Sequence, residues 1–231
     1  MSPRVANGFL VFENAPALAG ALPRNTVLHG DCQQVLATLP AGSVDFVLTD
    51  PPYLVNYRDR LGRTIANDND PRWLKPVFAE LHRVLKPDSL MVSCYGWNAV
   101  DSFMAAWRAA GFRPVGHIVF AKAYASSRRF LRHHHEQAYL LAKGRPDMPS
   151  LVIPDIVPFP YTGNRLHPTE KPVAALEPLI ASLTKPGDLV LDPFSGSGSS
   201  LAAARNLGRA YLGIEIDADH VSTARTRMAS P

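Results

Sequence analysis

The chain has 231 residues, 46% of them hydrophobic, which is enough to bury one large core and excludes a chain dominated by disorder. Its net charge of +4 is compatible with a polyanionic partner but does not identify one. The 2 cysteines exclude a disulfide framework and a four-cysteine zinc site, so a reducing cytoplasm is the expected setting.

Residues 1–24 are expected to form an extension before a single domain over residues 25–231. The apolar run Phe9–Phe12 is followed closely by Glu13 and Pro16, and no stretch is long and apolar enough to predict a membrane span. The start of the chain also lacks the clean apolar region and cleavage site of a secretory signal.

The first chemically informative feature is the end of a predicted strand. Val44–Thr49 is an apolar run of strand length, and Asp50, Pro51, Pro52 and Tyr53 follow it directly. Because proline cannot donate to a sheet ladder, the chain must leave the sheet there, beyond the carboxyl end of the strand, where open parallel sheets bind ligands. A carboxylate, a rigid carbonyl and an aromatic face suit a flat base with an amino group, although Asp and Pro are also ordinary turn formers.

Residues 54–72 come next and carry Arg58, Arg60 and Arg63 close to a glycine. This pattern predicts a loop that faces DNA and contacts phosphates, and a solvated loop is the alternative.

Strand and helix patterns then alternate, which predicts a doubly wound sheet. Trp73–Leu85 has apolar residues at helical spacing, and residues 89–94 predict a strand. Asn98 is a candidate cap for a helix that ends at Gly111. Residues 112–121 and 136–142 predict two further strands.

Residues 126–135 form the most basic stretch, with Arg128, Arg129 and Arg132 as candidate DNA contacts. The stretch ends in the three histidines 133–135, which invite a metal interpretation. Consecutive side chains diverge, however, and no companion ligand motif lies nearby, so no metal site is expected.

A second signature lies near the C-terminus. Pro172 is placed as a first-turn residue of a helix, and residues 188–192 form a strand that ends in Asp192. Pro193–Gly198 then opens into a helix over 199–207, which allows a ligand to approach the backbone closely. The strand 210–215 closes on Glu215, where dinucleotide-type folds hold ribose hydroxyls.

These motifs together resemble the beta-class amino-group DNA methyltransferases, which use S-adenosylmethionine. The match covers residues 25–228 in the order of that class, catalytic half first, and rests on Gly30-Asp31-Cys32, Asp50-Pro51-Pro52-Tyr53, His167-Pro168-Thr169-Glu170-Lys171-Pro172, Asp192-Pro193-Phe194-Ser195-Gly196-Ser197-Gly198 and Gly213-Ile214-Glu215-Ile216. The resemblance implies an α/β fold: a doubly wound, mostly parallel, seven-stranded sheet with an antiparallel edge strand, Rossmann-like and circularly permuted.

The resemblance also implies roles for individual residues. Asp50 and the Pro51 carbonyl would accept from the amino group, beside Pro52, and Tyr53 would stack on the extruded base. The residues expected at S-adenosylmethionine, and at its product S-adenosylhomocysteine, are Asp31, Cys32, His167, Thr169, Lys171, Asp192, Phe194, Ser195, Gly196, Gly198 and Glu215. Thr169 or Lys171 alternatively caps or charges the start of the following helix.

Within this family an Asp at the first position of the turn accompanies adenine N6 more often, and a Ser accompanies cytosine N4. We therefore expect N6 of a flipped-out adenine in double-stranded DNA, with N4 of cytosine as the alternative. Residues 121–166 offer only a short target-recognition region, which favours a short recognition sequence, help from residues 54–72, or a homodimer.

Other activities fit the sequence less well. Methylation of a cytosine carbon needs a thiolate, usually after a proline, whereas Cys32 follows Asp31 and Cys94 follows Ser93. Methylation of RNA or of a protein glutamine commonly has Asn in place of this Asp. A nucleotide-binding or DNA-binding module without catalysis and an NAD-dependent dehydrogenase remain rivals from other classes.

Overall fold

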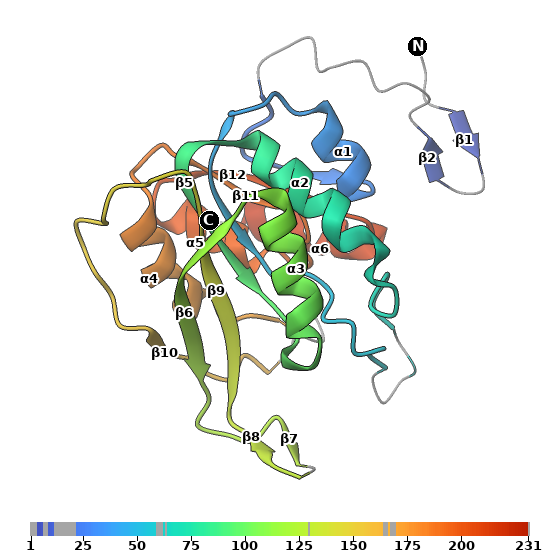
Figure 1. The fold of residues 1–231 in the computed structure, drawn as a ribbon. Coiled ribbons are helices and arrows are strands. Elements are labelled where there is room, and N and C mark those ends of the chain that lie inside the picture. Colours follow the sequence, from blue (N-terminus) through green and yellow to red (C-terminus); the bar gives the residue numbers. More distant parts are fainter. Residues whose placement is uncertain are drawn as a thin grey trace.

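The computed structural model describes residues 4–6, 9–11, 22–58, 62, 64–128, 130–163, 166 and 170–230. Its main feature is a sheet of eight strands between two layers of helices (Figure 1). The strands are β3 (Thr26–His29), β4 (Val44–Thr49), β5 (Leu85–Cys94), β6 (Arg113–Ala121), β9 (His135–Lys143), β10 (Ile156–Pro158), β11 (Leu189–Asp192) and β12 (Ala210–Glu215). The helices are α1 (Cys32–Thr38), α2 (Leu74–Val84), α3 (Val100–Ala110), α4 (Val173–Leu183), α5 (Ser199–Asn206) and α6 (Ala218–Ala229), with the 3₁₀ turns η1 (Pro71–Trp73) and η2 (Trp97–Ala99).

The strand order is β10-β6-β9-β5-β4-β11-β12-β3. Strand β9 pairs antiparallel with both neighbours, β5 and β6, and every other pairing in this sheet is parallel. The expected doubly wound, mostly parallel α/β sheet is thereby confirmed.

Two apolar cores lie on the two faces of the sheet. Helices α1, α2 and α3 bury side chains such as Leu36, Phe78 and Trp107 against one face. Helices α4, α5 and α6 bury side chains such as Leu179 and Leu201 against the other. Strand β4 contributes to both cores, which explains why its sequence is apolar almost without interruption.

The direction of winding reverses between β4 and β11, which are hydrogen-bonded neighbours. After β4 the chain forms α2 on one face, and after β11 it forms α5 on the other. A reversal of this kind leaves a crevice beyond the carboxyl ends of the two strands, where ligands bind in open α/β sheets. Both signatures in the sequence come directly after these two strands.

Two short hairpins lie outside the main sheet: β1 (Arg4–Ala6) pairs with β2 (Phe9–Val11), and β7 (Ser127–Arg128) pairs with β8 (Arg132–His133). The second hairpin connects the end of β6 to the start of β9, so it projects from the edge of the sheet at which β4 ends (Figure 1). Among the described residues, no helix is long and apolar enough to cross a membrane.

Several local expectations need refinement. Ile156–Pro158 forms an eighth strand, β10, at one edge of the sheet. The antiparallel strand β9 is the third strand from this edge, whereas it was expected at the edge itself. Asn98 does not cap α3, because the 3₁₀ turn η2 precedes that helix and its N-cap is Ala99. Pro172 is the N-cap of α4, one position before the expected first turn. The end of α3 at Gly111 is confirmed, with a left-handed φ of 98°.

Candidate active site

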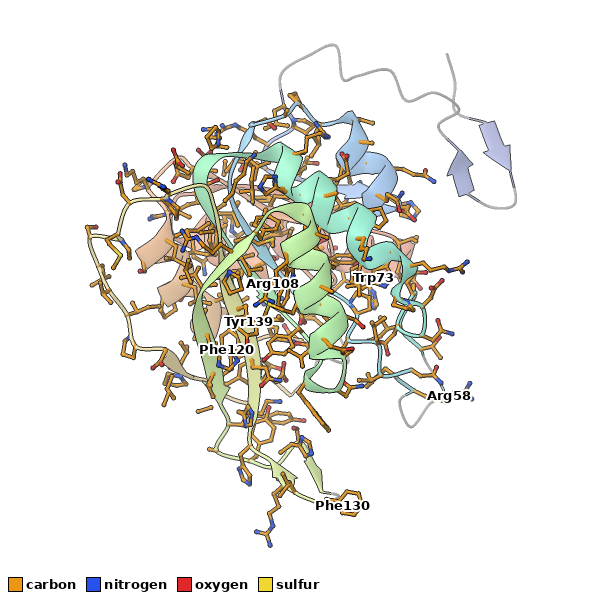
Figure 2. All side chains as sticks on the ribbon, viewed as in Figure 1. Arg58, Trp73, Arg108, Phe120, Phe130 and Tyr139 are labelled. Carbon is orange, nitrogen blue, oxygen red and sulfur yellow. The ribbon has the colours of Figure 1, made fainter. Side chains whose placement is uncertain are left out.

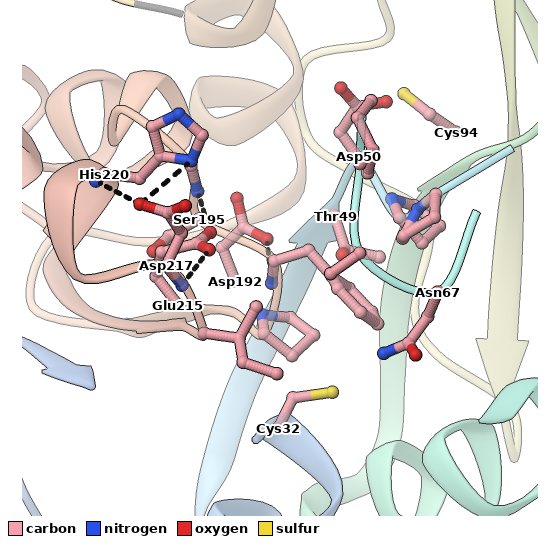
Figure 3. Close-up of a pocket in the computed structure, with 18 of the residues that line it drawn as sticks. Cys32, Thr49, Asp50, Asn67, Cys94, Asp192, Ser195, Glu215, Asp217 and His220 are labelled. Atoms are coloured by element: carbon pink, nitrogen blue, oxygen red, sulfur yellow. Dashed lines mark hydrogen bonds and ion pairs between the residues drawn. The ribbon is translucent and has the colours of Figure 1, made fainter. Parts of the chain in front are cut away.

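A cavity of about 250 Å³ lies in the crevice between β4 and β11. Residues from both signatures line it, among them Asp50, Tyr53, Asp192, Gly196 and Glu215. Figure 3 shows Asp50 and Cys94 on one side of this cavity and Glu215 and Asp217 on the other. The acidic turn and the glycine loop, far apart in the sequence, therefore share one space.

Asp68 holds the turn after Tyr53 in place, a role that no sequence motif indicated. Its buried carboxylate accepts hydrogen bonds from the backbone N–H of Leu54 at 2.8 Å and of Tyr57 at 2.6 Å. Gly96 lies against the same turn, and a Cβ on it would come within 2.4 Å of the Tyr53 carbonyl oxygen. A side chain at position 96 would push the turn out of place.

The carboxylate of Asp50 already has two partners in the chain. The Tyr53 hydroxyl donates to Asp50 Oδ1 at 2.7 Å, and the Lys171 ammonium donates to Asp50 Oδ2 at 2.5 Å. Burial, followed by the charge of Asp50, raises the pKa of Tyr53 well above its usual value, so the hydroxyl stays protonated and remains a donor. Tyr53 therefore orients Asp50 in addition to presenting its ring to the cavity.

Lys171 connects Asp50 to a second acid, Glu136. The Lys171 ammonium lies 2.9 Å from Glu136 Oε2, and Lys122 donates to Glu136 Oε1 at 2.5 Å. Burial would raise the pKa of Glu136, but the two ammonium groups together lower it to about 2. Burial would likewise lower the pKa of Lys171, and Asp50 and Glu136 raise it above its ordinary value. Glu136 and Lys171 are therefore both charged at neutral pH.

The glycine loop is shaped by backbone that favours glycine and by one buried acid. Gly196 and Gly198 have φ of 49° and 79°, and Gly198 is the N-cap of α5. Asp192 accepts from Phe194 N at 3.1 Å and from the Ser200 hydroxyl. Burial is the main cause that raises the pKa of Asp192 to about 7.

Glu215 closes the loop from the end of β12. Its Oε2 accepts from Gly196 N at 2.8 Å and its Oε1 accepts from Asp217 N at 2.9 Å. Each oxygen keeps a lone pair for a further donor, as holding a hydroxyl would require. Asp31 lines the same cavity, but its side chain caps α1 by accepting from Gln33 N at 2.8 Å.

Both cysteines line the cavity. Burial, followed by the nearby charge of Asp31, raises the pKa of Cys32, and burial, followed by Asp50, raises that of Cys94. Both thiols are therefore protonated at neutral pH, and a thiol is a far weaker nucleophile than a thiolate. This agrees with the exclusion of carbon methylation drawn from the sequence.

The remaining expected residues either lie outside the described part of the chain or are exposed at the surface. His167, Thr169, Arg60, Arg63 and Arg129 lie outside the described residues. Arg58 is exposed beside a bridge to Thr64, and Arg132 is exposed on β8; Figure 2 shows Arg58 and Phe130 pointing away from the body of the protein. Across the described ranges no group of His, Cys, Asp and Glu side chains is arranged to hold a metal ion.

Lys122 and Glu136 were missed by sequence reasoning because neither belongs to a motif. They lie near the ends of two antiparallel strands, where Glu136 pairs with Phe120. The register of that pairing places Lys122 beside Glu136, and Lys171, which is distant in the sequence, connects Glu136 to Asp50.

Comparison with known proteins agrees with this geometry. The family model for DNA methylase of the N6/N4 type matches residues 44–155 and 155–226. YubD of Escherichia coli (strain K12), whose name describes it as a methylase, is 55% identical over 203 residues, 88% of this chain and 89% of that protein. The DNA adenine methyltransferase YhdJ of the same organism is 29% identical over 249 residues, 88% of this chain and 82% of its own.

Solved structures show the same fold. The M1.HpyAVI–SAM complex superposes with a TM-score of 0.72 at 24% identity, over 89% of this chain and 99% of that chain. The cytosine-N4-specific PvuII DNA methyltransferase superposes with a TM-score of 0.71 at 17% identity, over 88% of this chain and 86% of that chain.

Proposed function

The chain belongs to the N6/N4 DNA methylase family, and from this we propose that it transfers a methyl group from S-adenosylmethionine to N6 of a flipped-out adenine in double-stranded DNA. The observation that supports the proposal most is the shared cavity: Asp50 and the loop around Gly196 line the same space. Transfer between two bound molecules needs their binding groups to meet in this way.

The lining of the cavity fits the cofactor that the family uses. S-adenosylmethionine supplies an electrophilic methyl group on a sulfonium sulfur. We propose that Glu215 holds the ribose, that Asp31 and Cys32 lie by the adenine, and that Asp192, Phe194, Ser195, Gly196 and Gly198 hold the methionine part. His167, Thr169 and Lys171 stay predictions for the same end of the cofactor. The lone pairs left on Glu215 and the glycine backbone support this arrangement.

Asp50 is the residue proposed to act on the amino group. The nitrogen lone pair of an aromatic amine is delocalised into the ring, and an acceptor for its N–H bonds favours the pyramidal form that attacks. Asp50 and the Pro51 carbonyl would provide two such acceptors, with Pro52 stiffening the turn. Because this contact strengthens as positive charge develops on nitrogen, Asp50 acts on turnover more than on cofactor affinity.

Adenine is preferred over cytosine for two reasons. The turn begins with Asp50, which the resemblance associates with adenine, and YhdJ is named as an adenine methyltransferase. The PvuII enzyme shares the fold and is named as specific for cytosine N4, so the fold itself does not discriminate. Mapping modified bases by single-molecule sequencing identifies the base and the atom together.

The proposed DNA contacts are Arg58, Arg60 and Arg63 in the loop 54–72 and Arg128, Arg129 and Arg132 in the basic stretch 126–135. Base flipping costs a few kcal/mol, and stacking on Tyr53 returns about 1–3 kcal/mol, so backbone contacts have to supply the rest. Phe130 and Leu131 at the hairpin tip are 104% and 74% exposed and add apolar surface next to Arg132.

The recognition region proposed within 121–166 includes, where it is described, this hairpin, strand β9, the segment that follows β9, and the short strand β10. A short recognition sequence, contacts from the loop 54–72, and a second copy of the chain are three ways to complete it. The length and symmetry of the modified sequence distinguish them, since a symmetric dimer reads a symmetric site.

The change Asp50→Ala tests the proposal. We expect the variant to bind S-adenosylmethionine in a calorimeter as the wild type does, because Asp50 is assigned to the amino group. Transfer of labelled methyl to DNA should fall by roughly 10²–10⁴-fold. The matched control is Asp101→Ala, which removes an exposed acid in the first turn of α3, outside the cavity. Unchanged transfer in Asp50→Ala would remove Asp50 from its role.

A further inference from the structure

In the proposed reaction Asp50 gains a donor in addition to the two that it already has. Tyr53 donates to Oδ1 and the Lys171 ammonium donates to Oδ2 at 2.5 Å, and the ammonium draws electron density from Oδ2 and makes it a weaker acceptor for the amino group of the base. The Lys171 side chain is only 6% exposed, so water cannot replace Asp50 as its partner. A buried ammonium that loses its carboxylate needs another one close by.

Glu136 is positioned to be this second carboxylate. Its Oε1 is held by Lys122 at 2.5 Å, which fixes the carboxylate in place. Its buried Oε2 lies 2.9 Å from Lys171 Nζ, in an ion pair whose geometry falls short of an aligned hydrogen bond. The ammonium of Lys171 therefore lies between Asp50 Oδ2, to which it donates a hydrogen bond, and Glu136 Oε2, with which it forms an ion pair without an aligned hydrogen bond.

We propose that Glu136 is a positioning residue for methyl transfer: when the amino group of the base binds Asp50, the hydrogen bond of Lys171 moves from Asp50 Oδ2 to Glu136 Oε2. Lys122 keeps Glu136 in place during this exchange. No proton is transferred, and Lys171 stays an ammonium throughout. This inference rests on the proposed function, because the exchange is needed only if Asp50 binds an amino group.

The proposal requires that Glu136 act through Lys171. A double-mutant cycle measures the coupling between these two residues. The four proteins are wild type, Glu136→Gln, Lys171→Met and the combination. The measured quantity is the single-turnover rate of labelled methyl transfer to DNA from a strain that lacks DNA methyltransferases. We expect Glu136→Gln to lower this rate about tenfold or more, with cofactor affinity unchanged by calorimetry.

The combination decides the mechanism. In the Lys171→Met background, Glu136→Gln should change the rate by less than about twofold, because the Lys171 ammonium through which Glu136 acts is already absent. An equal loss in both backgrounds, or no loss in the wild-type background, would overturn the role of Glu136.

A charge-balanced variant separates this role from simple burial of a charge. Glu136→Gln leaves Lys122 without its carboxylate, whereas Glu136→Gln with Lys122→Met removes the pair together. We expect this double variant to fold and to keep the same loss of transfer. Recovery of the wild-type rate would mean that Glu136 only neutralises Lys122, and the proposal would fail.

Glu80→Gln is the matched control, because Glu80 is also ion-paired, to Arg83 at 2.7 Å, but outside the cavity. It should transfer methyl groups at the wild-type rate. Wild-type protein that transfers no methyl group from S-adenosylmethionine would refute the proposed function itself. A wild-type rate that Glu136→Gln leaves intact would refute only the positioning role.

Discussion

At the scale of single residues, two buried carboxylates, Asp192 in the cavity wall and Glu136 behind Lys171, have pKa values shifted in opposite directions, because their neighbours differ. Glu136 is surrounded by two ammonium groups, and its pKa falls to about 2. Asp192 has only hydroxyl and N–H donors to offset its burial, and its pKa rises to about 7. One acid is therefore fixed as an anion, while the other changes its charge near neutral pH. This difference makes the stability of the protein depend on pH in a testable way.

The variant Asp192→Asn should reveal this dependence. Because the pKa of Asp192 is higher in the folded state than the ordinary value of 3.8, the folded state binds the proton more tightly. The wild type should therefore lose stability relative to Asp192→Asn as the pH rises from about 4 to 7, by at most about 1.4 kcal/mol per pH unit. Above that range the difference should level off.

Urea unfolding of both proteins across this range measures the difference directly. The shift at Glu136 has the opposite sign and acts at low pH, but it is common to both proteins and cancels. A difference in unfolding free energy that is the same at every pH would contradict the raised pKa of Asp192.

At the scale of elements, the hairpin of β7 and β8 is placed to serve the cavity. It extends from the edge of the sheet at which β4 ends, and the His133 ring lies 6.0 Å from the ring of Trp97 in η2. Trp97 follows Gly96, which packs on the Tyr53 turn. The hairpin is thus connected to Tyr53, which is proposed to stack on the base, through the His133–Trp97 ring contact and the packing of Gly96 on the turn.

The change Arg132→Ala tests the hairpin as a DNA contact. If Arg132 binds a phosphate, its loss should weaken binding to all DNA sequences alike and lower the salt slope of log K by about 0.9. The affinity for S-adenosylmethionine should stay the same. Arg113→Ala is the control, because Arg113 is an exposed arginine at the start of β6, at the opposite edge of the sheet and outside the recognition region. Titrations of labelled duplex at several salt concentrations supply both numbers, and an unchanged slope in Arg132→Ala would exclude this contact.

The elements also show what sequence alone can predict. The Asp50 turn and the loop of Gly196 and Gly198 were found because each is a local pattern between a strand and a helix. Strand β10 was not expected, since its three residues gain their strand character only by pairing with β6. The capping role of Asn98 failed because a 3₁₀ turn took its place. The ion pairs around Lys171 join residues as far as 121 positions apart, which no local pattern reports.

At the scale of the whole molecule, the cavity connects the two cores. Asp31 and Cys32 lie at the start of α1 on one face of the sheet, and the glycine loop leads into α5 on the other. The Arg227 guanidinium reinforces this from α6 by donating to the Ser197 carbonyl at 3.3 Å and to Glu170 at 3.1 Å. A ligand that fills the cavity therefore touches segments that unfold with both cores, and it should stabilise the protein as a whole.

This coupling makes thermal unfolding a direct test of the cofactor. A ligand at about 100 times its Kd adds about 2.7 kcal/mol to the free energy of unfolding. For a chain of this size that corresponds to a rise in Tm of about 5–10 °C. We expect S-adenosylmethionine and S-adenosylhomocysteine to give this rise in both wild type and Asp50→Ala, because the proposed cofactor contacts do not involve Asp50. NAD at the same concentration should leave Tm unchanged, since the contacts that we assign to the glycine loop are to a methionine group; a larger rise with NAD would favour the dehydrogenase rival.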